Sequence, residues 1–244
     1  MSLHVTAATA LRVLRQLRRD PRTLALLLVV PPALITLFRY VLDAHPDTFD
    51  RVGGPMVGIF PFTTMFVVTS IAMLRERTTG TLERLMTLPL AKLDLLLGYG
   101  VAFAVMATIQ ASVTSFVAFG LLGLDIHGSV AVVILFAIAN AVLGMALGLF
   151  TSAFARTEFQ AVQFLPAVVF PQILLCGLIV PREDMAAVLR YVSYVLPLTW
   201  AFDGLSHAVA GGSPGIVVRD AAIVLGVTVL ALALGATTLR RRTG

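Results

Sequence analysis

The sequence predicts an all-α integral membrane protein with six transmembrane helices. Of its 244 residues 58% are hydrophobic and 13% charged, with a mean hydropathy of +0.94, whereas soluble domains carry about 25% charged residues. No segment alternates in polarity as a β-barrel strand does, and lipid offers the backbone no outside hydrogen-bond partners, which favours helices. Six apolar runs approach or exceed the roughly 20 residues that cross a bilayer, and we predict spans at residues 23–42, 56–74, 95–123, 129–153, 161–180 and 215–239.

The basic residues sort to one side of these spans. The other side holds only Arg51, Arg182, Arg190 and Arg219, and Arg39 lies inside the first span. Because positive residues favour the cytoplasmic side, we expect both ends of the sequence in the cytoplasm and the chain in the cytoplasmic membrane as a multi-pass protein. The net charge of +5 then reflects orientation rather than nucleic-acid binding. The cytoplasmic set is Arg12, Arg15, Arg18, Arg19, Arg22, Arg75, Arg77, Arg84, Lys92, Arg156, Arg240, Arg241 and Arg242.

Residues 3–20 have the pattern of a basic amphipathic helix, which Asp20-Pro21 would end. Such a helix is expected to lie in the membrane interface, with its apolar side among acyl chains and its arginines among head groups. The alternatives are a solvated basic tail and a signal peptide, although the apolar run that follows is long for a signal peptide and lacks an A-x-A site. The apolar side carries Ala7, Leu11, Leu14 and Leu17, and the polar side Arg12, Arg15, Gln16 and Arg19.

Several polar residues interrupt the apolar runs, and in lipid they need protein or water partners. We interpret them as lining a weakly polar translocation path, with hydrogen bonding between helices as the alternative for each. Gly144 and Gly148 form a GxxxG pair that permits close helix packing, and prolines at 31, 32, 166 and 171 predict bends. The path residues are Thr69, Gln110, Thr114, Asn140, Gln163 and Gln172.

The sequence shows no chemistry of its own for energy supply. No Asp, Glu, Lys or His lies near the middle of a span, where ion-coupled carriers usually keep such groups, and no G-x-x-x-x-G-K-[ST] loop is present to bind ATP. We expect no catalytic residue, no metal site and no cofactor in this chain. ATP and magnesium would be bound by a separate ATPase. The single cysteine, Cys176, is expected to be a buried apolar residue.

Residues 181–214 are too polar to span a bilayer and too apolar for a free loop. They predict two outer half-helices separated by Pro197 that dip into the outer interface, with a plain loop as the alternative. On the cytoplasmic side, residues 76–92 predict a turn at Thr79-Gly80-Thr81 and then a short helix that ends at Pro89. Its side chains would form an apolar knob with a charged rim, which suits docking into a partner, and an ordinary basic loop is the alternative. The knob is Leu82, Leu85 and Met86, and the rim is Glu83 and Arg84.

Two stretches carry a resemblance to a known family. "LRERTTGTLERLMTLPLAKLDLLLGY" at residues 74–99 and "YVSYVLPLTWAFDGL" at 191–205 resemble permease subunits of the type 2 exporter family of ATP-binding-cassette (ABC) transporters, above all bacterial drug-efflux permeases of the daunorubicin-resistance type. The resemblance implies one permease domain over residues 1–244, a coupling helix between spans two and three, a cytoplasmic ATP-binding partner, and a dimer with a second permease copy or close homologue around a central path. The coupling contacts would be Glu76, Arg77, Gly80, Thr81, Leu82, Glu83, Arg84, Leu85 and Met86.

We therefore expect the membrane subunit of an ATP-driven exporter that moves a hydrophobic or amphiphilic, drug-like compound outward. Relatives in the same family that export lipid-linked glycans or glycolipids leave that substrate class open. From other classes, an ion-coupled multidrug carrier acting alone and a non-transporting membrane scaffold are the alternatives.

Overall fold

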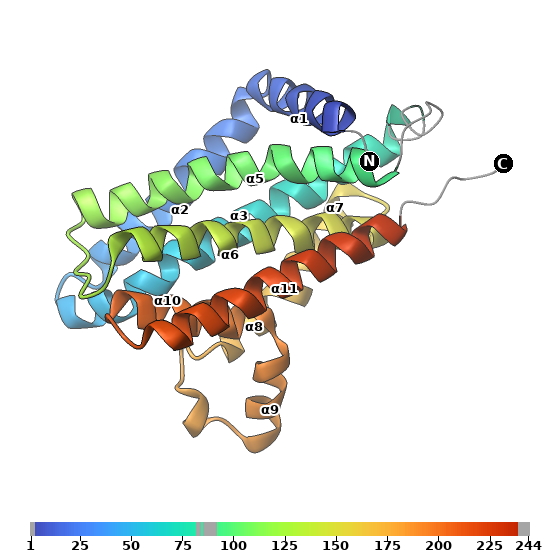
Figure 1. Ribbon diagram of the computed structural model, residues 1–244. Coiled ribbons are helices and arrows are strands. Elements are labelled where there is room, and N and C mark those ends of the chain that lie inside the picture. The colour runs from blue at the N-terminus through green and yellow to red at the C-terminus, as the bar shows by residue number, and fades with distance from the viewer. Residues whose placement is uncertain (1–2, 82–83, 85–91, 239–244) are drawn as a thin grey trace.

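A computed structural model describes residues 3–81, 84 and 92–238 of the chain. The described residues form helices and loops, without a strand among them (Figure 1). The helices are α1 (Leu3–Arg18), α2 (Pro21–Val41), α3 (Pro46–Thr78), α5 (Lys92–Phe116), α6 (Val130–Thr151), α7 (Glu158–Phe164), α8 (Phe170–Leu175), α9 (Ala187–Val195), α10 (Pro197–Val209) and α11 (Pro214–Thr238). Short π and 3-10 turns add η1 (Val117–Leu121), η2 (Ser152–Phe154), η3 (Leu165–Val169) and η4 (Arg182–Asp184).

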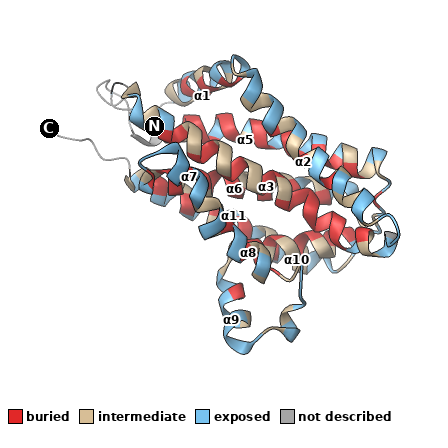
Figure 2. Cartoon of the chain, turned by 180° about the vertical axis from the view of Figure 1, so that it is seen from behind, coloured by how far each residue is buried: buried red, intermediate tan, exposed pale blue. Residues whose placement is uncertain are grey.

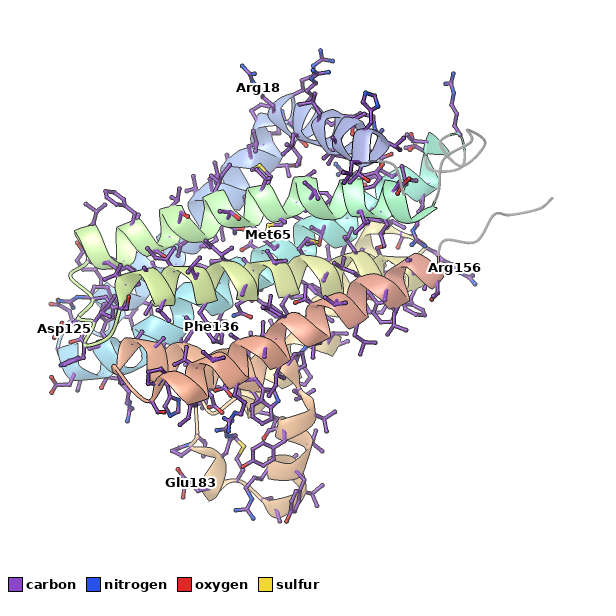
Figure 3. The ribbon with its side chains drawn as sticks, in the orientation of Figure 1. Arg18, Met65, Asp125, Phe136, Arg156 and Glu183 are labelled. Carbon is purple, nitrogen blue, oxygen red and sulfur yellow. The ribbon has the colours of Figure 1, made fainter. Side chains whose placement is uncertain are left out.

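Six helical segments are long and apolar enough to cross a membrane, which confirms the all-helical, six-span prediction. The start of α1, the start of α5 and the end of α11 lie at the same end of the bundle (Figure 1), as an even number of spans requires. Arg156 lies at that end and Asp125 at the opposite one (Figure 3). The segments run Pro21–Val41, Asp47–Thr78, Asp94–Leu121, Val130–Phe154, Glu158–Leu175 and Pro214–Thr238.

Two span boundaries differ from the prediction by more than a few residues. The second helix begins at Pro46, ten residues before the expected start, because its first turns bury Phe49 and Val52 although their neighbours in the sequence are polar. The fifth span ends at Leu175 rather than at residue 180, and Gly177 follows with a φ of +104° that favours glycine. Near the expected bend at Pro166 the helix changes to the π-helical turn η3, a common site of helix distortion.

Helices α3 and α6 pack face to face through the predicted GxxxG pair. A Cβ at Gly144 would lie 2.2 Å from the carbonyl oxygen of Phe62, and one at Gly148 would lie 2.4 Å from that of Phe66. Only glycine therefore lets the two backbones approach this closely. Figure 2 shows buried residues along α3, α5, α6 and α10, whereas only 17% of the residues in the most apolar window of α2, and of the fifth span, are buried.

Helix α1 lies across α5 and buries a different stripe from the one expected. Ala7 and Leu11 are exposed, and Leu17 is the one residue of the expected apolar side that is fully buried. The contact is set by the partner, since a Cβ at Gly98 of α5 would lie 2.5 Å from the Cβ of Thr9. The stripe that faces the bundle is Thr9, Ala10, Val13 and Leu17.

The outer segment contains two helices, α9 and α10, which meet at Pro197; that they dip into a membrane interface stays a prediction. Helix α9 projects from the bundle, while α10 packs against it beside α3, α6 and α11 (Figure 1). Leu198, Ala201 and Leu205 of α10 are fully buried. The chain leaves α10 at Gly211, whose φ is +68°. Helix α10 is therefore part of the core, and α9 is its exposed lead-in.

Candidate coupling site and translocation path

The candidate coupling site is built on the end of α3. A helix of 33 residues is about 50 Å long at 1.5 Å per residue, which exceeds a hydrocarbon core of roughly 30 Å. The last turns of α3 can therefore extend beyond the bilayer and carry the residues that follow them outside it. Those turns end in the sequence Arg75-Glu76-Arg77.

The turn after α3 has the geometry that the sequence predicts. Gly80 has a φ of +72°, and a Cβ there would meet nothing within 4 Å, so backbone conformation rather than space favours glycine. The Thr79 hydroxyl donates to the carbonyl of Arg75 over 2.8 Å and lies 3.0 Å from the Thr81 hydroxyl. Gly80 accepts a hydrogen bond of 2.9 Å from the backbone N–H of Arg84, which is helical spacing. Leu82, Glu83, Leu85 and Met86 lie outside the described residues.

Arg75, Glu76 and Arg77 at the end of α3, which we call the α3 stem, each contact a different helix. The guanidinium of Arg75 donates to both oxygens of Glu158 at the start of α7, over 2.7 and 3.1 Å. Glu76 turns toward α1, and Arg77 lies 3.5 Å from the hydroxyl of Thr238 at the end of α11. A displacement of the α3 stem would therefore change its contacts with α1, α7 and α11 at the same time.

Glu76 is more enclosed than Arg75, with 12% of its side chain exposed against 54%. Its Oε1 accepts a hydrogen bond of 3.3 Å from Gln16 and lies 3.7 Å from the guanidinium of Arg12. Arg12 also donates to the hydroxyl of Tyr99 on α5, and its guanidinium carbon lies 5.5 Å from the centre of that ring. The side chain of Glu76 thus fastens α1 to α3 and α5. That a partner subunit contacts it remains a prediction.

The six residues expected to line a path lie at different helix contacts of the single chain, and three of them have hydrogen-bond partners there. Thr69 donates to the carbonyls of Met65 and Met145 over 2.7 and 3.2 Å, so it serves the α3–α6 contact. Gln172 joins α8 to the start of α10, since its Oε1 accepts from the backbone N–H of Leu198 over 3.4 Å. Thr114 bonds back to the carbonyl of Gln110 in its own helix. Thr69 and Gln172 thus link neighbouring helices, and the hydroxyl of Thr114 is satisfied within α5.

The remaining three path candidates are the less satisfied ones. Gln110 on α5 and Asn140 on α6 are fully buried, and no described residue hydrogen-bonds to either side-chain amide. Asn140 lies where α3 passes, because a Cβ at Gly58 would be 3.0 Å from its Nδ2. Gln163 is exposed on α7. Buried polar groups without partners are uncommon. A water molecule or a different arrangement of the helices would therefore stabilise the amides of Gln110 and Asn140 by giving them hydrogen bonds.

An ionic cluster on the outer side was not foreseen from the sequence. Arg182 of η4 pairs with Asp203 of α10 over 2.7 Å, and Arg219 pairs with its neighbour Asp220 on α11 over 2.8 Å. Asp220 is fully buried. Burial raises the pKa of Asp203, and the hydrogen bond and charge of Arg182 act against that rise. An acidic residue inside the predicted span 215–239, next to an arginine, was the available signal.

Aromatic rings brace these arginines. The guanidinium of Arg182 lies 5.5 Å from the ring of Tyr194, and that of Arg219 lies 5.3 Å from the ring of Trp200, which suits cation–π attraction. Beside the cluster is a cavity of about 900 Å³ between α9, α10, the first turns of α3, the α5–α6 connection and the segment that follows α8. Glu183, at its rim, lies on the projecting outer segment (Figure 3). Among the described residues no group of three or more His, Cys, Asp and Glu could hold a metal ion.

Comparison with known proteins decides the family. The model of the ABC-2 type transporter family matches residues 5–209, which include α1, all but the last span, the α3 stem and the outer half-helices. The chain belongs to this family. It is also similar to the "Probable multidrug ABC transporter permease YbhS" of Escherichia coli, with 29% identity over 72% of this chain and 47% of that protein. The E. coli permease YbhR is 32% identical over 55% of this chain and 36% of its own length.

A eukaryotic relative shows the same likeness. "ABC transporter G family member 20" of Dictyostelium discoideum is 26% identical over 67% of this chain and 22% of that protein. The chain spans about half or less of the length of the curated relatives it matches. The family assignment and the six apolar helices together identify a multi-pass membrane permease of the ABC type.

Proposed function

We propose that this ABC-2 family chain is the membrane subunit of an exporter that moves a hydrophobic or amphiphilic, drug-like compound outward across the cytoplasmic membrane. A separate ATPase would dock on residues 76–92, and a second permease copy or close homologue would complete the path. The α3 stem is the observation that carries the proposal. It joins the expected docking segment to α1, α7 and α11 through Glu76, Arg75 and Arg77.

The coupling follows from these contacts. Work released by ATP hydrolysis in a cytoplasmic subunit can reach the spans only through a segment that lies outside the bilayer and is fixed to several helices. The α3 stem meets both conditions, since α3 is longer than the hydrocarbon core and its last three charged residues each bind another helix. In this scheme the side chains of Glu76 and Arg77 pass on the motion, and Leu82, Leu85 and Met86 make the contact with the ATPase.

The proposal also draws support from sidedness and from the relatives. Thirteen lysines and arginines flank the spans on the side of the α3 stem, which favours the cytoplasm for that side. Two E. coli relatives carry the words "multidrug ABC transporter permease" in their names. Gln163 faces outward from α7 within a span, where an amide needs a partner other than lipid, and a second permease copy would supply one.

The test changes the docking segment and leaves the spans intact. Leu82→Asp places a carboxylate in what should be a dry interface, and burying that carboxylate costs several kcal/mol unless it protonates or stays wet. Glu83→Lys reverses the charge at the rim of the same contact. We expect tagged wild-type protein to copurify with a P-loop ATPase from its own host and to support ATP-dependent transport in vesicles. Both variants should insert normally, lose the ATPase and lose transport.

Glu183→Lys is the matched control, because it makes the same charge reversal on an exposed outer residue. It should dock and transport like the wild type. Normal docking by Leu82→Asp and Glu83→Lys would refute the docking role of residues 76–92. Transport driven by a pH or sodium gradient without any ATPase would replace the proposal with an ion-coupled carrier, and absence of transport with the ATPase bound would leave a scaffold.

A further inference from the structure

A second cavity, of about 570 Å³, opens between α1, α2, α3 and α5 at the end of the bundle that carries the α3 stem. Its volume falls within the roughly 300–1,000 Å³ of small-molecule sites. None of the six path candidates lines it, and it is separate from the outer cavity, which lies at the other end of α3. This cavity is therefore not part of the translocation path that the sequence predicts.

The walls of this cavity are apolar along their length. Val67, Val68, Ile71 and Ala72 supply one side from α3, and Phe103 supplies another from α5. Leu26 of α2, which is 60% exposed, lies at the margin. Because α2 is the least buried of the long spans together with the fifth, the cavity is bounded on that side by a helix with few neighbours. An apolar body could enter there from the bilayer.

The cytoplasmic end of the cavity is polar and carries two carboxylates, Asp20 and Glu76. Oε2 of Glu76 is buried and accepts no hydrogen bond from any described residue. Asp20 caps α2, accepting from the backbone N–H and the hydroxyl of Thr23 over 3.2 and 2.6 Å. These hydrogen bonds lower the pKa of Asp20, so it is ionised at neutral pH.

The positive charge that lines the cavity is already paired with a carboxylate. Arg75 is the basic residue of the lining, and Glu158 already occupies it with two hydrogen bonds. Arg12, behind Glu76, shares its guanidinium between Oε1 of Glu76 and Tyr99. Asp20 forms no close ion pair within the described part of the chain, although the charge of Arg75 also acts on it, and Oε2 of Glu76 accepts no hydrogen bond from a described residue. The charges therefore complement a cation at the mouth and an apolar body in the interior.

We propose that this cavity binds a protonated amine carried on an apolar body, with the ammonium between Asp20 and Glu76 and the apolar part against Val67, Val68 and Phe103. An ammonium supplies three N–H donors, which match the free lone pairs of the two carboxylates. The ligand can come from two sources, an exported amphiphilic amine or an aminophospholipid of the surrounding leaflet. The cavity also touches Thr79 and Thr81 of the turn after α3, so its occupant lies beside the segment on which the ATPase is proposed to dock.

The test uses the purified chain alone, in phosphatidylcholine vesicles, and so does not depend on the ATPase. The probe is dodecylamine with a diazirine at the end of its chain, and dodecanol and dodecyl sulfate with the same diazirine are the comparison probes. We expect the amine to cross-link to peptides that contain residues 67–72 and Phe103. In the double variant Asp20→Asn, Glu76→Gln this labelling should fall at least about tenfold, as loss of charge-assisted hydrogen bonds predicts.

Two further variants separate binding from folding. Ala72→Phe fills the apolar part without changing the charge, and should also abolish labelling. Asp43→Asn removes a negative charge from an exposed position on the outer side and should label like the wild type. Phosphatidylethanolamine in the vesicles should compete if the natural ligand is a lipid; labelling that resists it assigns the site to an exported amine. Equal labelling by dodecanol, stronger labelling by dodecyl sulfate, or undiminished labelling of Ala72→Phe would overturn the proposal.

Discussion

The glycine contacts between α3 and α6 give a prediction whose size can be worked from the structure. A methyl group at Gly144 would lie 2.2 Å from the backbone oxygen of Phe62, and one at Gly148 would lie 2.4 Å from that of Phe66. Ordinary contacts between such heavy atoms are about 3.5 Å or more. The methyl group at Gly148 would also lie 2.2 Å from the Thr69 hydroxyl oxygen. Since each position clashes with a backbone atom, a side-chain rotation cannot relieve either clash in full. Gly144→Ala or Gly148→Ala must therefore move α3 and α6 apart by about 1 Å.

The cost has three parts. Overpacking of this kind costs about 1–3 kcal/mol. Separation also weakens two hydrogen bonds across the contact, from Thr69 to the carbonyl of Met145 and from Ser70 to that of Gly148, each worth about 0.6 kcal/mol inside a membrane protein. Replacing glycine by alanine in a helix returns about 1 kcal/mol. The net expectation is a loss of about 1–3 kcal/mol for either substitution.

Gly226 supplies the matched control, because it lies within α11 and a Cβ there would meet nothing within 4 Å. Gly226→Ala should be neutral or slightly stabilising. The three variants and the wild type would be unfolded side by side in one detergent, by heating and by denaturant, with helical circular dichroism as the signal. If Gly144→Ala and Gly148→Ala unfold at the same temperature and denaturant concentration as Gly226→Ala, α3 and α6 do not approach each other as described. That result would refute the α3–α6 packing derived from these glycines.

Two further predictions concern the outer half of the molecule. Burial raises the pKa of the Cys176 thiol to about 11, so only about one thiol in ten thousand is ionised at neutral pH. Maleimide should therefore label native Cys176 far more slowly than a cysteine that replaces Gly212 in a Cys176→Ala background. Comparable labelling rates would contradict the burial of Cys176. Arg182→Gln leaves the partly buried Asp203 without its cation and should cost about 1–3 kcal/mol near neutral pH. The pKa of Asp203, which burial already raises, then rises further. Because a carboxyl with a raised pKa favours the folded state at low pH, this deficit should shrink as the pH falls from neutral, and a deficit independent of pH would show that Asp203 does not carry it.

The spans were predictable because hydropathy is a local property of the chain. Where they departed from expectation, the deciding contacts were remote. Residues 47–55 read as polar, yet they continue α3 because Phe49 and Val52 face the core and Gly53 approaches Leu124 of the α5–α6 connection. Likewise, periodicity identifies α1 as a helix, but Gly98 of α5 selects which of its stripes is buried. The sequence of a helix identifies its most apolar side, but the shape of the neighbouring helix decides which side is buried.

The same distinction between local and remote contacts applies to the candidate sites. The turn at Gly80 was predictable, since its glycine and threonines are adjacent in sequence, whereas the contacts of Glu76 with Arg12 and Gln16 join positions 60 or more residues apart. Polar residues inside spans can be recognised from sequence, but their partners cannot. Thr69 and Gln172 find partners within the chain. Gln163 faces outward from a span, where lipid offers an amide no hydrogen bond. This is why we propose that a second permease copy supplies the partner of its amide, and the single chain by itself does not test that proposal.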